Sequence, residues 1–274
     1  MNAVGDHYRA GNLDAAVDAA IQTVREKPTD RSARFSLVEM LCIAGDFERA
    51  DKHLDAMLTQ SDTPLVTMSL YRQLLRAEVH RHETFLQGRP PELVDDPGAA
   101  IKWSLQALLD ARDGDVAVSE PPGHGVTFEV NGQPAEQLRD LDDVLAAVLE
   151  LHTPTGKYFW VPWSAIESIT ISPAKRPIDL LWRHAKVAID NGPDGDVYLP
   201  AIYVAPAKSE TATTDDGPWE GETDDHRLGR RTDWVSCKNG WYRGVGQKIF
   251  AAGETDWGLH DIQQINIAGE SVQS

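Results

Sequence analysis

The 274-residue sequence is short of cysteine and of long apolar runs. Its two cysteines, Cys42 and Cys237, are far apart and form no C-x-x-C pair, which indicates reduced thiols rather than a disulfide framework. No apolar run approaches about 18 residues, so no transmembrane helix is predicted. The N-terminus shows no basic segment followed by an apolar one, so we predict no signal peptide and expect a cytoplasmic protein.

Basic residues are also scarce, because 26 Lys and Arg stand against 43 Asp and Glu and give a formal net charge of −17. A protein that neutralises phosphates needs the opposite balance, which argues against nucleic acid as a partner. The same reasoning argues against an anionic membrane surface. The acidic balance fits either solubility alone or a basic protein partner.

What the sequence does contain is a repeat in its first 58 residues. Gly11 followed by Ala16 recurs 34 residues later as Gly45 followed by Ala50. Each copy predicts a helix, a turn at the glycine and a second amphipathic helix, and Asp30 is placed to cap the helix between the copies. The positions expected to be buried in the second helices are Ala16, Ala20 and Val24, then Ala50, Leu54 and Met57 or Leu58. This spacing resembles that of tetratricopeptide repeats.

A third helical hairpin is expected over residues 65–111. The pattern predicts a helix over 65–87 with Gly88 as its C-cap, and a second helix from Pro97 to Ala111. The positions expected to be buried are Leu70, Leu74 or Leu75, Val79, Ile101, Leu105 and Leu108 or Leu109. Helical arrays of this kind usually leave a groove for a peptide. Alternatively the hairpins only pack onto the rest of the chain, and both arrangements stay open.

Residues 119–125 are rich in proline and glycine, and we place the domain boundary there. A tetratricopeptide-like helical domain is expected over 1–118 and a β-rich domain over 119–274, which makes the fold α+β. Further strands are predicted over 127–130, 185–189, 197–200, 229–234, 241–250 and 259–267. Residues 144–151 fit a strand or a short helix, and the neighbouring pattern favours the strand. Residues 208–226 are polar, acidic and aperiodic, and are expected to form a mobile loop.

The strand predicted over 158–161 is the centre of this β-rich domain. Alternation places Tyr158 and Trp160 on one face and puts apolar residues on both faces, so both faces should be covered. Pro162 cannot donate to a ladder and should end the strand. The tryptophans expected to pack against its rings are Trp182, Trp234 and Trp241.

Histidines and carboxylates were considered as metal or catalytic groups. His80 and His82 are two residues apart on a helix and cannot bind one ion, whereas Glu78 and His82 are spaced for a surface pair. An enzyme would have to draw on Asp140, Asp142, Glu150, His152, Asp179 and His184. No nucleophile elbow, H-E-x-x-H motif or phosphate loop accompanies them, and Gly244-x-Gly246 lacks the third glycine of a dinucleotide loop. We predict no catalytic, cofactor or metal site.

An ordered set of motifs resembles the ImpE family, also called TagJ, of accessory proteins in type VI secretion. The segments that carry the resemblance are G-K-Y-F-W-V-P at 156–162, P-I-D-L-L-W at 177–182, L-P-A-I-Y at 199–203, G-R-R-T-D-W at 229–234 and G-V-G-Q at 244–247. One segment departs from the family pattern, because Ala146-Ala147 stands where the family has Gly-Pro. We therefore expect a locally different turn there.

The resemblance implies an adaptor rather than an enzyme. It implies protein partners, namely the small subunit of the contractile sheath (TssB) and the AAA+ ATPase that recycles the contracted sheath (ClpV). It also implies an N-terminal helical part and a β-rich C-terminal part, as the residue pattern does. A generic tetratricopeptide-like peptide-binding chaperone is the alternative, and a hydrolase with a carboxylate site in the β-rich domain is a more remote one.

Overall fold

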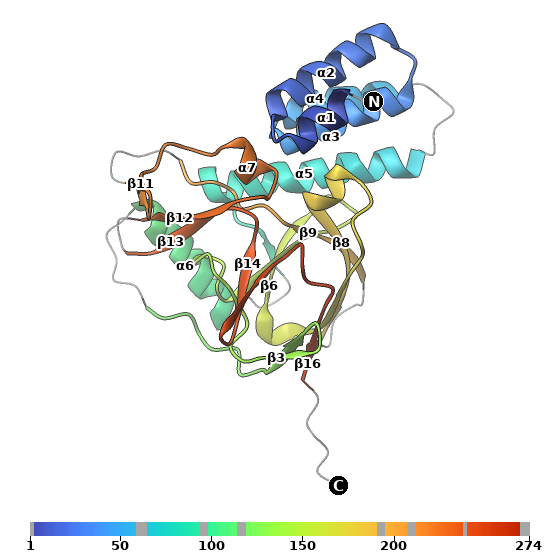
Figure 1. Ribbon diagram of the computed structural model, residues 1–274. Coiled ribbons are helices and arrows are strands. Elements are labelled where there is room, and N and C mark those ends of the chain that lie inside the picture. Colours follow the sequence, from blue (N-terminus) through green and yellow to red (C-terminus); the bar gives the residue numbers. More distant parts are fainter. Residues whose placement is uncertain are drawn as a thin grey trace.

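The computed structural model describes residues 3–58, 65–93, 98–113, 119–190, 195–207, 212–237 and 240–268. It confirms the α+β class, since helices make up the N-terminal part and strands dominate the remainder. Figure 1 shows helix α5 (Leu65–Gln87) running between the N-terminal hairpins on one side and the β-rich part on the other. This central helix contacts both parts.

The two predicted hairpins are present. Helices α1 (Ala3–Arg9) and α2 (Leu13–Glu26) form the first, and α3 (Arg31–Ile43) and α4 (Phe47–Leu58) form the second. Both turn glycines have positive φ, 79° at Gly11 and 78° at Gly45, a conformation that favours glycine. Asp30 caps α3 as predicted, because its Oδ1 accepts from the backbone N–H of Ala33 at 3.1 Å. The expected positions of α2 and α4 are buried, namely Ala16, Ala20, Val24, Ala50, Leu54 and Met57, and α2 also buries Leu13 and Val17.

Helix α5 has the predicted bounds, and its C-cap Gly88 has a φ of 82°. Leu74 and Leu75 are buried, but the prediction for Val79 is wrong, because its side chain is 40% exposed. The face that α5 turns inward is partly polar, since Glu78 and Arg81 are both buried. Apolar periodicity cannot detect a buried face that is built from paired charges.

Helix α6 (Ala99–Asp113) buries Ile101 and Leu108 as predicted, whereas Leu109 is 49% exposed. The predicted start at Pro97 lies outside the described residues. Helices α5 and α6 do not form the expected third hairpin. Both instead pack on strands β5 (Val148–His152) and β6 (Tyr158–Pro162). None of the described helices is both long and apolar enough to cross a membrane.

A nine-stranded sheet is the framework of the β-rich part, with the order β1-β6-β5-β9-β8-β7-β16-β2-β3. Its other strands are β1 (Glu92–Leu93), β2 (Phe128–Val130), β3 (Gln133–Ala135), β7 (Ile166–Ile171), β8 (Trp182–Ile189), β9 (Gly195–Pro200) and β16 (Gln264–Ile267). All neighbouring pairs are antiparallel except β1 and β6. Strand β1 comes from the expected helical domain, so the chain contributes to the sheet from both sides of residue 118.

Smaller sheets and short helices complete the β-rich part. The remaining elements are β4 (Arg139–Asp140), β14 (Ile249–Ala252) and β15 (Thr255–Gly258) in one sheet, β12 (Thr232–Ser236) with β13 (Tyr242–Gly246), β10 (Thr213–Thr214) with β11 (Gly217–Pro218), the 3₁₀ helices η1 (Trp163–Ala165) and η2 (Pro177–Leu180), and α7 (Asp224–Arg227). A core of apolar side chains fills the space between the large sheet and β14. Gly244 of β13 leaves room for the ring of Tyr203, because a Cβ at this position would lie 2.4 Å from that ring.

The expectation of a structureless loop over 208–226 is wrong for its described part. From residue 212 onward the segment forms the β10–β11 pair and α7. Trp219 and His226 are buried within it. The acidic composition suggested solvation, but two buried rings and a helix cap hold the segment against the protein.

The run 144–151 is part turn and part strand. Val148 N donates to Leu145 O at 3.0 Å and Leu145 N donates to Asp142 O at 2.9 Å, so the chain turns before β5 begins at Val148. The preferred strand therefore covers only the second half of the run. Ala146 and Ala147 lie in this turn.

Strand β6 has the predicted alternation and ends at Pro162. Tyr158 and Trp160 face the core shared with α5 and α6, whereas Val161 faces the core of the β-rich part. The aromatic neighbours are partly those expected. Trp241 is buried in the same cluster as Tyr158 and Trp160, and Trp234 packs against that cluster, whereas Trp182 belongs to the helical core. The Trp160 ring also lies 6.2 Å from the ring of Phe85 on α5, which was not predicted.

Replacing Trp160 with alanine should lower the free energy of unfolding by roughly 3–5 kcal/mol, because the indole is fully buried and its loss leaves a cavity between α5 and the sheet. Denaturant unfolding followed by circular dichroism measures this. Tyr242→Ala is the control, since that ring is largely exposed and its loss should cost less than about 1 kcal/mol. Equal stability of the two variants would contradict the prediction.

Candidate functional site

Of the six groups on which an enzyme would have to draw, four lie in one buried cluster of charges, namely Asp140, Asp142, Glu150 and His152. At its centre is Glu150 of β5, whose Oε1 accepts from Arg81 Nε at 2.9 Å and whose Oε2 lies 2.5 Å from Lys248 Nζ. Tyr158 of β6 also donates to Glu150, and Trp160 Nε1 donates to the Tyr158 hydroxyl. Burial alone would raise the pKa of Glu150, but Arg81 and Lys248 hold it well below its usual range.

The cluster continues toward β4 and β13. Lys248 Nζ also lies 2.9 Å from Asp140 Oδ2, and the Tyr203 hydroxyl donates to Asp140 Oδ1 at 2.6 Å. Asp142 is paired with Arg243 Nε at 2.8 Å. It also accepts from Gly244 N at 3.0 Å. Each of these carboxylates is therefore satisfied by a buried cation and by hydrogen-bond donors.

Glu78 of α5 extends the cluster toward the helices. Its Oε1 lies 3.1 Å from Arg81 Nη1, and its Oε2 accepts from Trp182 Nε1 at 2.9 Å. His152 Nε2 lies 3.5 Å from the same Oε2, but neither ring nitrogen of His152 forms a hydrogen bond within the described residues. Burial lowers the pKa of His152 to about 4, against the attraction of Glu78, so the ring is neutral at pH 7.

The chemistry of this cluster is that of a structural ion network. A general acid or base needs a pKa near the working pH, whereas the pKa values of Glu78 and Glu150 are strongly depressed. Burial raises the pKa of Asp140, and Lys248 beside it acts in the opposite direction. Within the described residues no group of three or more His, Cys, Asp or Glu could hold a metal ion. His82 pairs with Glu78 at 3.3 Å, as their spacing predicts. The pair does not lie at the surface as expected, because Glu78 is buried.

The other two predicted groups lie elsewhere and apart from the cluster. Asp179 caps η2 by accepting from the backbone N–H groups of Lys175 at 2.8 Å and Arg176 at 3.0 Å. His184 lies between Ser172 Oγ, 2.9 Å from Nδ1, and Asp196 Oδ1, 3.0 Å from Nε2. Sequence reasoning missed Ser172 and Asp196, because only the pairing of β8 with β7 and β9 brings them to His184.

The Ser172–His184–Asp196 chain does not have the geometry of a hydrolase triad. A triad histidine presents Nε2 to the serine and Nδ1 to the aspartate, and here the two nitrogens are exchanged. The carboxylate of Asp196 is 67% exposed, so it cannot work in a water-excluded site. The Ser172 backbone N–H already donates to His184 O at 2.8 Å. This chain is a surface hydrogen-bond network.

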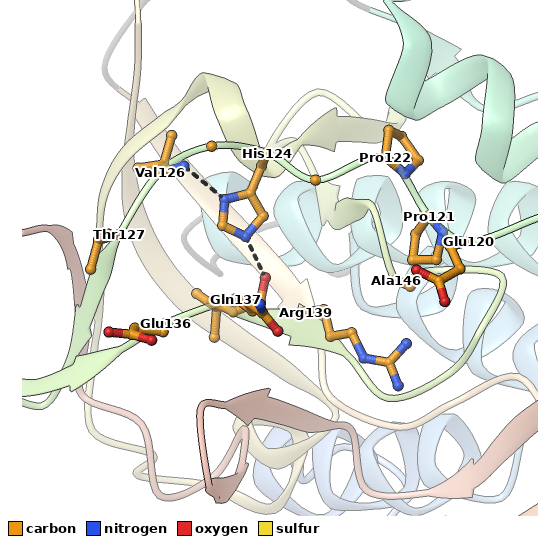
Figure 2. Close-up of a pocket in the computed structure, with 13 residues that line it drawn as sticks. Glu120, Pro121, Pro122, His124, Val126, Thr127, Glu136, Gln137, Arg139 and Ala146 are labelled. Atoms are coloured by element: carbon orange, nitrogen blue, oxygen red, sulfur yellow. Dashed lines mark hydrogen bonds between the residues drawn. The ribbon is translucent and has the colours of Figure 1, made fainter.

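A pocket of about 590 Å³ lies under the predicted linker, between residues 120–127 and residues 136–139 (Figure 2). His124 spans it, accepting from Val126 N at 3.2 Å through Nδ1 and lying 2.9 Å from Leu138 O through Nε2. Ala146, at the position that departs from the family pattern, lies in its wall. Its carboxylates, on Glu120 and Glu136, are exposed, and Arg139 is half-buried.

The inner face of the helical array is covered by the β-rich part. Residues 37–43 of α3 are all buried, which on a helix means burial on every side. Arg176 stacks 4.2 Å from the Phe35 ring centre and its Nε lies 2.8 Å from Glu39 Oε1. The residues that the β-rich part adds to the helical core are Ile178, Leu181, Trp182, Ile202 and Leu228. Of the two open arrangements, the hairpins here pack onto the rest of the chain.

Polar contacts fasten the first hairpin in the same way. Asp224 of α7 accepts from the backbone N–H of Leu13 at 2.9 Å, at the start of α2. Arg230 donates to the carbonyl of Tyr8 at 2.7 Å, at the end of α1. Asp224, in the predicted loop, and Arg230, shortly after it, thus satisfy backbone groups at the ends of both helices that meet at Gly11.

The fold defines an α+β protein in which N-terminal helices pack on a β-rich part with a nine-stranded mixed sheet. Residues 132–266 match the model of the ImpE protein family. The chain is 28% identical over 265 residues to the "Type VI secretion system accessory component TagJ" of Pseudomonas aeruginosa, covering 94% of this chain and 88% of that protein. It is also similar to the crystal structure of protein VPA1032 from Vibrio parahaemolyticus, with a TM-score of 0.81, 26% identity and 99% coverage of both chains. The chain belongs to the ImpE family.

Glu150→Gln should destabilise the protein by roughly 3–5 kcal/mol, because it removes a buried charge and leaves Arg81 and Lys248 without their shared partner. Chemical unfolding measures the loss. Glu167→Gln on β7 is the matched control, since Glu167 is exposed and the change should cost less than about 0.5 kcal/mol. A stable Glu150→Gln protein would show that the network is dispensable.

His152 should make stability depend on pH. Its pKa is about 4 in the folded protein and about 6.5 in an unfolded chain, so the unfolded state binds a proton first as the pH falls. The contribution is complete above pH 6.5, and about 3 kcal/mol is lost between pH 6.5 and 4. Unfolding curves across this range measure the slope. His152→Gln should flatten it, and an unchanged slope would assign the pH dependence to other groups.

Proposed function

We propose that this chain is a non-enzymatic accessory protein of the type VI secretion system and acts as an adaptor between protein partners. The observation that carries the proposal is the extent of the likeness to the TagJ accessory component, which spans 94% of the chain and so includes both the helical and the β-rich part. The paired state of the buried charges supports the absence of catalysis. Both described cysteines are free thiols, which supports a cytoplasmic location.

The partners we propose are the small subunit of the contractile sheath and the AAA+ ATPase that recycles it. Protein partners of this kind commonly contribute an amphipathic helix or an extended peptide. The inner face of α3 is filled by Arg176 and by side chains of the β-rich part, so recognition has to use another surface of the helices. A generic peptide-binding chaperone remains the alternative function.

Retention of the purified sheath subunits or the ATPase on the immobilised chain tests the adaptor role. The whole chain is required, because the helices share a core with residues 178–228 and the region 1–118 would lose it. We expect the small sheath subunit, the ATPase or both to be retained. An unrelated protein of similar net charge controls for non-specific attraction to an acidic surface. Retention of neither partner would contradict the proposal.

The non-enzymatic part of the proposal has its own test. A fluorophosphonate probe labels serine nucleophiles that a histidine activates, and Ser172 is the serine next to His184. We expect no labelling of the folded protein, because the histidine nitrogens are exchanged and the Ser172 backbone N–H already donates to His184 O. Labelling that disappears in Ser172→Ala would establish a hydrolase site.

A further inference from the structure

Helix α5 carries an apolar face that is covered along one part and open along the next. Met68 and Leu75 on this face are buried, and Arg72 beside them pairs with Asp51 of α4 at 2.7 Å. Helix α4 begins at Phe47, whose ring lies 5.1 Å from that of His82. Leu86 lies one turn after His82 on α5, where α4 no longer covers the helix, and its side chain is 48% exposed. The same face therefore continues past the helix that covers it.

Two depressions meet at this open part of α5. One, of about 170 Å³, lies between the α3–α4 turn, α5 and residues 202–205. The other, of about 340 Å³, lies between the ends of α5 and α6 and residues 204–207. Both are lined by Leu86, Val204 and Ala205, so they adjoin each other, and we call the two together the α5 groove. Its apolar walls include Phe47, Leu86, Val204, Ala205, Ala207 and Val235.

One end of the α5 groove presents an arginine. Arg112 of α6 is exposed and lines the groove, and its Nη1 lies only 2.5 Å from where a Cβ on Gly88 would be, next to the end of α5. The other arginines that line the groove have carboxylate partners, since Arg227 pairs with Glu222 and Arg243 with Asp142. An exposed guanidinium beside an apolar trough suits a carboxylate that follows apolar side chains.

We propose that the α5 groove is the docking site for an amphipathic helix of the partner, with apolar side chains on Leu86 and a carboxylate on Arg112. The occupant would lie on the open end of α5 near Leu86. It would continue the cover that α4 gives to the neighbouring stretch of the same face. This inference rests on the proposed adaptor function and specifies its site. It assigns an acidic helix, although the net charge of −17 by itself favours a basic partner.

Charge and packing variants of the full chain test the site. Leu86→Asp and Arg112→Glu should each weaken binding of the purified small sheath subunit, or of the ATPase, by roughly tenfold or more in isothermal titration calorimetry. Leu109→Asp is the matched control for the leucine, because Leu109 is 49% exposed on α6 and lines neither depression. Arg76→Glu on α5 is the matched control for the arginine. Both controls should bind as the wild type does, and thermal melting should show that all four variants are folded.

The outcomes separate the site from the function. Wild-type binding that neither groove variant weakens would overturn the α5 groove and leave the adaptor function standing. Tighter binding by Arg112→Glu would also overturn the inference, because it would mean a basic occupant. If the wild-type chain binds neither partner, the adaptor function fails and the groove assignment fails with it. Rising ionic strength should weaken wild-type binding more than binding by Arg112→Glu.

Discussion

The pairing of Arg81 on α5 with Glu150 on β5 is the constraint on which the rest of the structure depends. A buried charge needs a partner of opposite sign. A shift of α5 along the sheet would therefore expose Arg81 and Glu150 or leave each of them buried without its partner. Lys248 then ties the same carboxylate to Asp140, and Glu78 ties the same guanidinium to Trp182. The network thereby fixes the helical part, the large sheet and the β14 sheet in one arrangement.

That arrangement decides what the helical part can do. A tetratricopeptide-like array usually offers its inner face to a ligand, but here α3 is buried on every side and α7 caps the first hairpin. The β-rich part occupies the place of a peptide. Surface left for recognition lies where this cover ends, and the open stretch of α5 near Leu86 combines apolar walls with an accessible arginine.

The aromatic strand β6 was predicted well because its signal is local. Alternation placed Tyr158 and Trp160 on one face, and Pro162 ended the strand. The partners of these rings were predicted only in part, since Trp234 and Trp241 lie in their cluster but the partners on α5 were missed. Those missed partners lie on α5, which is far from β6 in the sequence. Phe85 of α5 packs near Trp160, and Arg81 of α5 pairs with Glu150, the carboxylate to which Tyr158 donates. The sequence offered Asp140, Asp142, Glu150 and His152 as possible catalytic groups, but it did not predict that they share one buried cluster. The cations that pair with its carboxylates, Arg81, Arg243 and Lys248, come from two distant segments.

The sequence by itself determined the two hairpins, their glycine turns, the cap at Asp30 and the alternation of the main strands, because each depends on residues within a few positions of one another. Only the tertiary structure decided that α5 buries charges, that α6 lies on the sheet and that residues 212–226 are ordered. Those outcomes depend on long-range pairing. A charged residue has the same local pattern whether it faces water or a buried partner, and only the fold brings that partner to it.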